Sequence, residues 1–262
     1  METLNNMLLA VPKLATDDYV GFTFFVGCMA MMAASAFFFL SMSSFDSKWK
    51  TSILVSGLIT FIAAVHYYYM RDYWGGSVGL DADGEVVGSS PTFFRYVDWV
   101  LTVPLMCVEF YLILKVAGAT KNLMWKLIGA SVVMLVAGYW GEAVAMDQAA
   151  LWGFFSGAAY FYIVYLIMFG EAKELATKAG GSVLSAHNML VKFVLIGWAI
   201  YPLGYMIGTA TSPDGVAQWY SFMGDIGIDM NVVYNIGDAI NKIGFGLVVY
   251  SLAVASTSKD AA

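Results

Sequence analysis

The sequence predicts an all-α membrane protein built as a bundle of seven transmembrane helices. Of its 262 residues, 60% are hydrophobic and only 12% are charged, whereas a soluble domain has about 25% charged residues. Apolar runs of roughly 20 residues recur along the chain, and this is the length that crosses the hydrocarbon core of a bilayer. We therefore expect a multi-pass protein of the cell membrane. No basic patch suggests binding to nucleic acid.

Apolar runs and the polar breakers between them divide the chain into seven spans. The expected cores are residues 19–43, 50–71, 92–116, 122–142, 149–171, 187–210 and 229–256. Residues 1–18 are predicted to form an extracellular segment, 19–256 the seven-helix domain and 257–262 a cytoplasmic tail. The loop between the second and third spans is rich in Gly and Asp, which favours a small hairpin.

Lysines gather in alternate loops, and this sets the predicted orientation. The loops after the first, third and fifth spans hold Lys48, Lys50, Lys115, Lys121, Lys173 and Lys178. The opposite loops are rich in aspartate and nearly free of lysine. Because positive loops stay in the cytoplasm, we expect the N-terminus outside and the C-terminus inside.

Two spans carry charged residues inside their apolar runs. The third span holds Arg95, Asp98 and Glu109, and the seventh holds Asp238 and Lys242. Charges inside a bilayer are unfavourable unless they are paired, so they indicate a functional site. The alternative is that Asp238 and Lys242 form an i, i+4 ion pair that only offsets its own desolvation. That alternative leaves Glu109 unexplained.

A buried lysine is the side chain that forms Schiff bases with aldehydes. A cation at that position needs anions nearby, and Asp98 and Asp238 are the candidates. Glu109 lies about 16 Å deeper than Asp98 at 1.5 Å per residue, in an apolar region that favours a protonated carboxyl group. Thr102 shares the helix face of Asp98 and Glu109, and His66 in the second span reaches the outer half of the membrane. These groups predict a proton path across the membrane.

The motifs around these residues resemble the microbial rhodopsins. RYVDWVLTVPL in the third span, GWAIYPLGY in the sixth and YNIGDAINKIGFG in the seventh occur in the family's order. VHYYYMR and VEFYLIL resemble the proteorhodopsin branch. The resemblance covers residues 20–256. It implies a light-driven outward proton pump, not an enzyme, with all-trans retinal bound to Lys242 as a protonated Schiff base.

The resemblance also assigns roles to the charged residues. Asp98 would be the primary counterion and proton acceptor, Asp238 the second counterion and Glu109 the cytoplasmic proton donor. Arg95 would bridge towards the outer side, and Thr102 would place a hydroxyl near the Schiff base. Asp, Thr and Glu at these three positions resemble the outward proton-pump signature. The sequence shows no metal-ligand cluster, phosphate loop or nucleophile triad.

The retinal pocket implied by the resemblance is largely aromatic. Its expected residues are Trp99, Met106, Trp198, Tyr201, Pro202, Tyr205 and Asn241. Met106 falls where the family tunes colour, which implies green absorption, although ordinary packing also explains a methionine there. His66 matches a histidine near the counterion; the alternative is a hydrogen-bonded histidine at a helix interface. His187 is expected to be a solvated residue at the start of the sixth span.

Three positions depart from the pattern of the relatives. Gly153 replaces a tryptophan against the retinal ring, and in some relatives such a glycine opens a window for a carotenoid antenna; close helix packing is the alternative. Met230 replaces a proton-release glutamate, and Glu142, near the outer surface, is not a convincing substitute. Phe25 replaces a tryptophan that meets the histidine across a subunit contact. A homo-oligomer, a pentamer or hexamer, is still expected.

Two other functions would use the same fold. One is a photosensory rhodopsin that signals to a membrane partner. Sensors often lack a carboxylic acid at the donor position, so Glu109 favours a pump. The other is a retinal protein that conducts ions passively, for which the sequence offers no evident hydrated pore.

Overall fold

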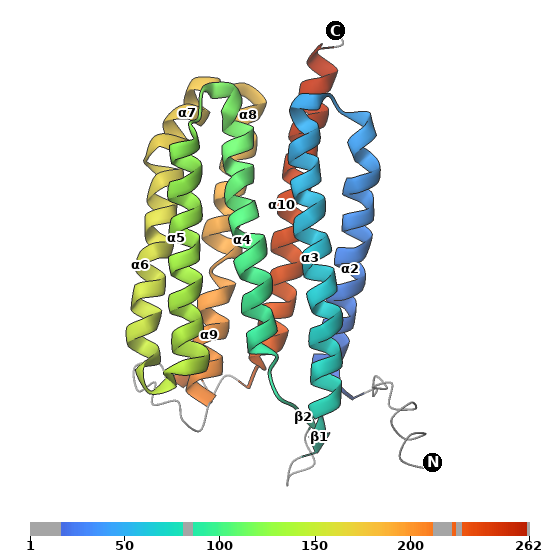
Figure 1. Cartoon of the computed structure of the whole chain (residues 1–262), viewed down its shortest axis with the longest axis vertical. Helices are drawn as coiled ribbons and strands as arrows, with labels where there is room; N and C mark the ends of the chain where they lie inside the picture. The colour runs from blue at the N-terminus through green and yellow to red at the C-terminus, as the bar shows by residue number, and fades with distance from the viewer. Residues whose placement is uncertain (1–16, 81–85, 212–221, 224–226, 261–262) are drawn as a thin grey trace.

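Seven helical stretches long enough to cross a membrane confirm the predicted fold (Figure 1). The structure, a computed structural model, describes residues 17–80, 86–211, 222–223 and 227–260. The seven stretches are Tyr19–Ser44, Ser47–Ser77, Thr92–Ala117, Lys121–Val144, Met146–Ala179, Gly181–Ala210 and Met230–Thr257. The chain is thus a multi-pass membrane protein. Most of the predicted N-terminal segment and the last two residues lie outside the described residues.

The stretches are built from α-helix, and five of the seven also contain short 3-10 or π-helical pieces. The α-helices are α2 (Tyr19–Ser41), α3 (Ser47–Ser77), α4 (Thr92–Leu114), α5 (Lys121–Tyr139), α6 (Ala149–Met168), α7 (Glu171–Ala179), α8 (Gly181–Lys192), α9 (Ile200–Thr211) and α10 (Met230–Asp260). The 3-10 pieces are η1 (Met42–Ser44), η2 (Lys115–Ala117) and η4 (Met146–Gln148). The π-helical pieces are η3 (Trp140–Val144) and η5 (Phe193–Gly197).

The largest boundary difference from the prediction lies between the fifth and sixth spans. Helix α7 continues the fifth span beyond residue 171, and α8 begins at Gly181 instead of 187. The segment EAKELATKA in α7 is too polar to be read as part of a membrane span, although its residues are good helix formers. Gly180 and Gly181, both with positive φ (64° and 50°), separate the two helices.

A short hairpin joins the second and third spans, as predicted. Strand β1 (Gly79–Leu80) pairs antiparallel with β2 (Val86–Val87). In Figure 1 the hairpin lies at the same end of the bundle as the starts of α2 and α10. The lysine-rich connections between α2 and α3, α4 and α5, and α6 and α8 lie at the opposite end. Which end faces the cytoplasm stays a prediction.

Helix α10 contacts α2, α3, α4, α8 and α9. Small residues allow close helix approach, as is common between membrane helices. A Cβ atom added at Gly246 of α10 would come within 2.5 Å of the Phe38 ring of α2. Side chains on the inner face of α10 are therefore surrounded by protein, and this is the face that carries Asp238 and Lys242.

The start of α2 is fixed by a buried carboxylate. One Asp18 oxygen accepts a hydrogen bond from the Gly21 backbone N–H (2.8 Å), and both oxygens lie 3.1 Å from the donor Nε1 of Trp74 in α3. An aspartate at this position satisfies an N–H group that has no partner within the helix. Asp18 therefore ties the first helix to the second.

We predict that Asp18→Ala destabilises the protein, whereas Asp17→Ala does not. Loss of a helix cap reduces the free energy of unfolding by about 1 kcal/mol, and here the Trp74 indole N–H also loses its acceptor. Asp17 is exposed and provides the matched control. Unfolding by sodium dodecyl sulfate titration measures the difference. Equal midpoints for the two variants would contradict this role of Asp18.

Candidate functional site

The centre of the bundle holds a buried lysine between two carboxylates. Lys242 is only 2% exposed, and Asp98 and Asp238 are fully buried. Lys242 Nζ lies 2.5 Å from Asp98 Oδ2 and 3.0 Å from Asp238 Oδ1. Asp238 is one helical turn before Lys242 on α10, and Asp98 comes from α4. The three predicted residues thus form one ion cluster. Lys242 is paired with a carboxylate of another helix as well as with the i, i+4 carboxylate of its own helix.

The two carboxylates have different surroundings. Asp238 accepts hydrogen bonds from the Tyr67 hydroxyl (2.9 Å), the Trp99 indole (3.0 Å) and the Tyr201 hydroxyl (2.9 Å). Asp98 Oδ1 has no partner among the described residues, so Lys242 is the partner of the Asp98 carboxylate. Donors to a carboxylate stabilise its charged form. Asp238 is therefore the more firmly held anion, and Asp98 is the better placed proton acceptor.

Glu109 lies on the same helix as Asp98, fully buried and without an ion pair among the described residues. Its Oε1 lies 2.5 Å from Ser56 Oγ of α3, and Ser56 Oγ also lies 3.2 Å from the Ser52 carbonyl oxygen. A hydroxyl has one hydrogen to donate. Ser56 donates to Glu109 and can share its hydrogen with the Ser52 carbonyl, while the second Glu109 oxygen, Oε2, has no partner among the described residues. Burial without a neighbouring cation disfavours the charged form of a carboxyl group. The site therefore suits a carboxyl group that holds a proton.

Thr102 lies between these acids on α4 and is fully buried. Its hydroxyl donates to the backbone carbonyl of Asp98 at 2.9 Å. Pro104 lies in the same helix and has no N–H to donate to the preceding turn. The helix is thus locally irregular between Asp98 and Glu109, where its backbone hydrogen bonds are modified by a hydroxyl and a proline.

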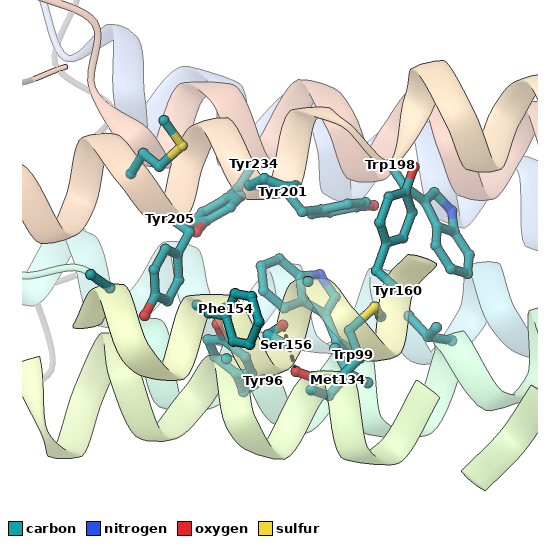
Figure 2. A pocket seen from close by; sticks show the side chains of 18 residues that line it. Tyr96, Trp99, Met134, Phe154, Ser156, Tyr160, Trp198, Tyr201, Tyr205 and Tyr234 are labelled. Atoms are coloured by element: carbon teal, nitrogen blue, oxygen red, sulfur yellow. Dashed lines mark hydrogen bonds between the residues drawn. The ribbon is translucent and has the colours of Figure 1, made fainter. Parts of the chain in front are cut away.

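A cavity of about 320 Å³ opens beside the ion cluster and is lined mainly by aromatic side chains (Figure 2). Six predicted pocket residues line it: Trp99, Gly153, Trp198, Tyr201, Pro202 and Tyr205. Met106 and Asn241 do not line it: Met106 is packed in the core, and Asn241 binds the backbone beside it. Tyr96, Tyr160 and Tyr234 also line the cavity and were not predicted.

The residues of this cavity fit retinal. The wall is apolar and built of flat rings, which suits a flat polyene. Trp99 and Tyr201 face the cavity and also donate to Asp238, the carboxylate next to Lys242. A buried lysine that could form a Schiff base, anions to compensate its charge and a flat apolar slot are therefore adjacent. These are the three features that binding of an aldehyde polyene requires.

A π-helical turn at η5 shapes one side of this cavity. The Gly197 carbonyl, exposed by this turn, accepts from Asn241 Nδ2 at 2.9 Å, and the Val194 carbonyl accepts from the Tyr160 hydroxyl at 3.0 Å. Turns of this kind release backbone carbonyls from the normal helical pattern and are frequent at functional sites. The turn ties the helix that bears Trp198 to the residue before Lys242.

Arg95 is fully buried, one turn from Asp98, and has no ion pair among the described residues. One nitrogen, NH2, donates to the side-chain oxygens of Asn231 and Asn235, each at 3.1 Å. The guanidinium carbon lies 4.9 Å from the centre of the Tyr234 ring. Arg95 therefore lies next to the ion cluster, as predicted, with amides and an aromatic ring as its direct partners.

The two histidines have different surroundings. His66 is half-buried, its Nδ1 lies 2.9 Å from the Ile62 carbonyl oxygen of its own helix, and it is near enough to Asp98 to interact with it electrostatically. Its role near the counterion stays a prediction. The prediction that His187 is solvated is wrong. His187 is fully buried, with Nε2 2.9 Å from the Ile167 carbonyl oxygen. Because α8 begins at Gly181, His187 lies well inside the helix, and its ring packs against Phe110.

Glu142, which the sequence analysis placed near the outer surface of the membrane, is a further buried acid. It is 4% exposed and lies in η3, the π-helical end of the fourth span. Glu142 accepts hydrogen bonds from the hydroxyls of Tyr96 (2.7 Å) and Tyr234 (3.2 Å to each oxygen). The sequence around Glu142 has no helical pattern of apolar residues that would indicate its burial, because a π-helical turn rotates the residue out of the α-helical register.

Comparison with known proteins identifies the family. The family described as "Bacteriorhodopsin-like protein" matches residues 18–256. The chain belongs to this family. It is 41% identical over 247 residues to the green-light absorbing proteorhodopsin of Gamma-proteobacterium EBAC31A08, which covers 94% of this chain and 90% of the relative. The chain is therefore a microbial rhodopsin and not an enzyme.

Solved structures of other microbial rhodopsins have the same fold. The structure of Exiguobacterium sibiricum rhodopsin matches with a TM-score of 0.72 and 30% identity, over 92% of this chain and 98% of that one. Xanthorhodopsin, described as a light-driven ion pump with dual chromophore, matches with a TM-score of 0.75 and 28% identity. That match covers 93% of this chain and 95% of xanthorhodopsin.

We predict that Gly197→Ala disturbs the site of this rhodopsin, whereas Gly129→Ala does not. A Cβ atom at Gly197 would overlap the Asn241 side-chain oxygen, while a Cβ at Gly129 would meet nothing within 4 Å. Overpacking of this kind lowers stability by about 1–3 kcal/mol; Gly129→Ala should be neutral or stabilising because alanine favours helix. Thermal unfolding of both variants measures this, and an unchanged Gly197→Ala would contradict the contact.

Proposed function

We propose that this microbial rhodopsin is a light-driven outward proton pump that carries all-trans retinal covalently on Lys242. The observation that carries the proposal is the buried cluster of Lys242, Asp98 and Asp238, in which one carboxylate is held by three further donors and the other has a free oxygen. This asymmetry provides one fixed counterion and one proton acceptor at the lysine nitrogen. Family membership and the fit of the cavity support retinal as the cofactor.

Lys242 would hold retinal through a Schiff base, and Trp99, Trp198, Tyr201, Pro202 and Tyr205 would enclose it. Bound retinal supplies visible-light absorption and an isomerisation that changes the position and basicity of the lysine nitrogen. The aromatic walls exclude water from the cavity and restrict the shapes that fit in it.

Asp98 takes the proton from the lysine nitrogen in this proposal. Its Oδ2 lies 2.5 Å from Lys242 Nζ, which is within proton-transfer distance. Asp238 stays ionised because Tyr67, Trp99 and Tyr201 donate to it, and it thereby stabilises the cationic form of the site before transfer. Arg95, one turn from Asp98, keeps positive charge on the outer side.

Glu109 returns a proton to the lysine nitrogen from the other half of the bundle. Its burial without an ion pair among the described residues suits a carboxyl group that is protonated at rest, and a donor must start in that form. Transport is outward if the end of the bundle with α7 and α8 faces the cytoplasm. The lysines of its connecting loops favour that orientation.

Three finer features remain proposals. The Gly153 backbone lines the cavity next to exposed Phe154, an arrangement that would admit the ring of a carotenoid antenna. Energy transfer from an added hydroxylated carotenoid, read in the excitation spectrum, would test it. The second feature is green absorption, which Met106 implies and which the absorption spectrum would test. The third is a homo-oligomer, a pentamer or hexamer, which the mass of the detergent complex would test.

Light-induced pH change in cells that express the protein with added retinal tests the function. A pump acidifies the medium, a protonophore abolishes the change, and exchange of sodium or chloride salts leaves it unaffected. A coloured protein without a pH change would favour a sensor. Alkalinisation that a protonophore enhances would mean that another ion is moved and would overturn the proposal.

We predict that Lys242→Ala abolishes the visible absorbance that added retinal produces, because Lys242 is the buried lysine of the described residues and pairs with Asp238, which binds the cavity residues Trp99 and Tyr201. Lys126→Ala, which removes a surface ion pair with Glu171, should keep full colour. Since Lys242→Ala leaves two buried carboxylates without a cation, the double variant Lys242→Ala/Asp98→Asn serves as a second test. Visible absorbance in both lysine variants would exclude the covalent link.

We predict that Glu109→Gln slows the recovery of the resting state after a flash by about a hundredfold, the usual contribution of a positioned proton donor. Ser56→Ala should slow recovery less, because it removes only the hydrogen-bond partner of Glu109. Glu174→Gln, at an exposed position on α7, is the matched control. Flash photolysis measures the recovery rate, and an unchanged rate in Glu109→Gln would remove Glu109 from the donor role.

A further inference from the structure

A buried cluster around Glu142 lies outside the Lys242 site and has no role in the mechanism described so far. Glu142 accepts from the hydroxyls of Tyr96 and Tyr234, which come from α4 and α10. Tyr96 and Tyr234 also line the aromatic cavity. Both rings pack edge to face on Trp99, and the centre of the Trp99 ring lies 4.9 Å from that of Tyr96 and 5.0 Å from that of Tyr234. The cluster is thus in direct contact with the wall of the proposed retinal site.

The charges around this cluster are balanced without Glu142. The buried cations of the site are Lys242 and Arg95, and the buried carboxylates that accompany them are Asp98 and Asp238. An ionised Glu142 would add an uncompensated negative charge, which is unfavourable in a buried setting. Among the described residues Glu142 has no ion pair. Burial without an ion pair suits a carboxyl group that holds a proton at rest, and the hydroxyls of Tyr96 and Tyr234 can stabilise the carboxylate once the proton has left.

Arg95 can stabilise Glu142 once that proton has left. Its Nε and NH1 atoms are buried and have no hydrogen-bond partner among the described residues. The guanidinium carbon lies 4.9 Å from the ring of Tyr234, whose hydroxyl contacts Glu142. A turn of the long arginine side chain would therefore bring free N–H groups towards Glu142, where charge-assisted hydrogen bonds would hold the carboxylate.

A second polar branch leads outward from Arg95, and the residues that the structure describes in it are an amide and a hydroxyl. It runs from Arg95 to the Asn231 side chain and on to the Ser90 hydroxyl (3.0 Å). Neither the amide of Asn231 nor the hydroxyl of Ser90 gains or loses a proton near neutral pH. Asp229, which follows on the same side, uses a carboxylate oxygen to bind the Asn231 backbone N–H (2.6 Å) at the start of α10. Glu142 is therefore the candidate for storage.

We propose that Glu142 is the proton-release group of this pump, an inference that rests on the proposed function. When Asp98 takes the proton from the lysine nitrogen, the O–H bond of Glu142 breaks and its proton passes to water at the outer end of the bundle, where Asp147, five residues on, is exposed. The carboxylate that remains accepts from Tyr96, Tyr234 and Arg95. The proton on Asp98 later returns Glu142 to its protonated form, so each cycle releases one proton.

The test follows proton release after a flash in retinal-loaded protein reconstituted in lipid nanodiscs, with a pH-sensitive dye outside. In the wild type the dye responds before the resting state recovers. In Glu142→Gln the proton leaves only as Asp98 gives it up, so the response should be delayed roughly tenfold or more and coincide with recovery. Asp229→Asn is the matched control, because asparagine also caps helices well, and its timing should equal that of the wild type.

Infrared difference spectroscopy provides a second readout that does not depend on transport. Release from Glu142 should produce the loss of a protonated-carboxyl C=O band on illumination, and Glu142→Gln should remove that band. Tyr96→Phe and Tyr234→Phe keep the rings but delete one donor each, so both should shift the band and delay release. These variants carry the test if Glu142→Gln fails to assemble.

Identical release times in the wild type, Glu142→Gln and both tyrosine variants would overturn the role of Glu142. A carboxyl band that is insensitive to Glu142→Gln, or that appears on illumination instead of disappearing, would also overturn it. Failure of the proposed function has a different signature. In that case the wild type itself would give no net acidification in cells.

Discussion

Burial of the Lys242 ammonium group is the constraint on which the rest of the structure depends. A cation in the middle of a membrane bundle needs anions in direct contact. The two carboxylates that supply them, Asp98 and Asp238, need donors in turn. Tyr67, Trp99 and Tyr201 meet this need for one carboxylate only. The ion cluster thereby fixes the relative positions of α3, α4, α9 and α10, and it leaves one acid available for proton transfer.

The two π-helical turns extend this site in opposite directions along the bundle. The turn at η5 releases the Gly197 carbonyl, which binds Asn241 beside the lysine. The turn at η3 places Glu142 against Tyr96 and Tyr234, whose rings pack on Trp99. Regular helices at these two places would direct the side chains elsewhere. The departures from α-helical geometry therefore connect the lysine, the cavity and the buried acid into one network.

The sequence was sufficient to predict what depends on local pattern. Apolar run lengths predicted seven spans, and charges inside those runs identified Lys242, Asp98, Asp238 and Glu109. It did not reveal contacts between distant helices, such as Ser56 with Glu109 or Tyr67 with Asp238, because a serine or tyrosine in an apolar helix has many possible neighbours. The prediction for His187 was wrong, and the burial of Glu142 was not predicted, for a related reason. Their burial depends on a polar helical extension and on a π-helical turn, and hydrophobic periodicity records neither.

The partners of the four buried acids order them along a direction of proton movement. Asp238 receives three neutral donors and a cation, so it stays charged. Asp98 shares the cation but keeps a free oxygen, so it is the one that changes protonation in the proposed cycle. Glu109 and Glu142 lie away from the lysine, contact hydroxyls and have no ion pair within the part of the chain that the structure describes, a setting in which a carboxyl group can be neutral before it gives up a proton. Two neutral acids on either side of a charged, asymmetric pair form a chain in which each proton transfer alters the charge felt by the next group.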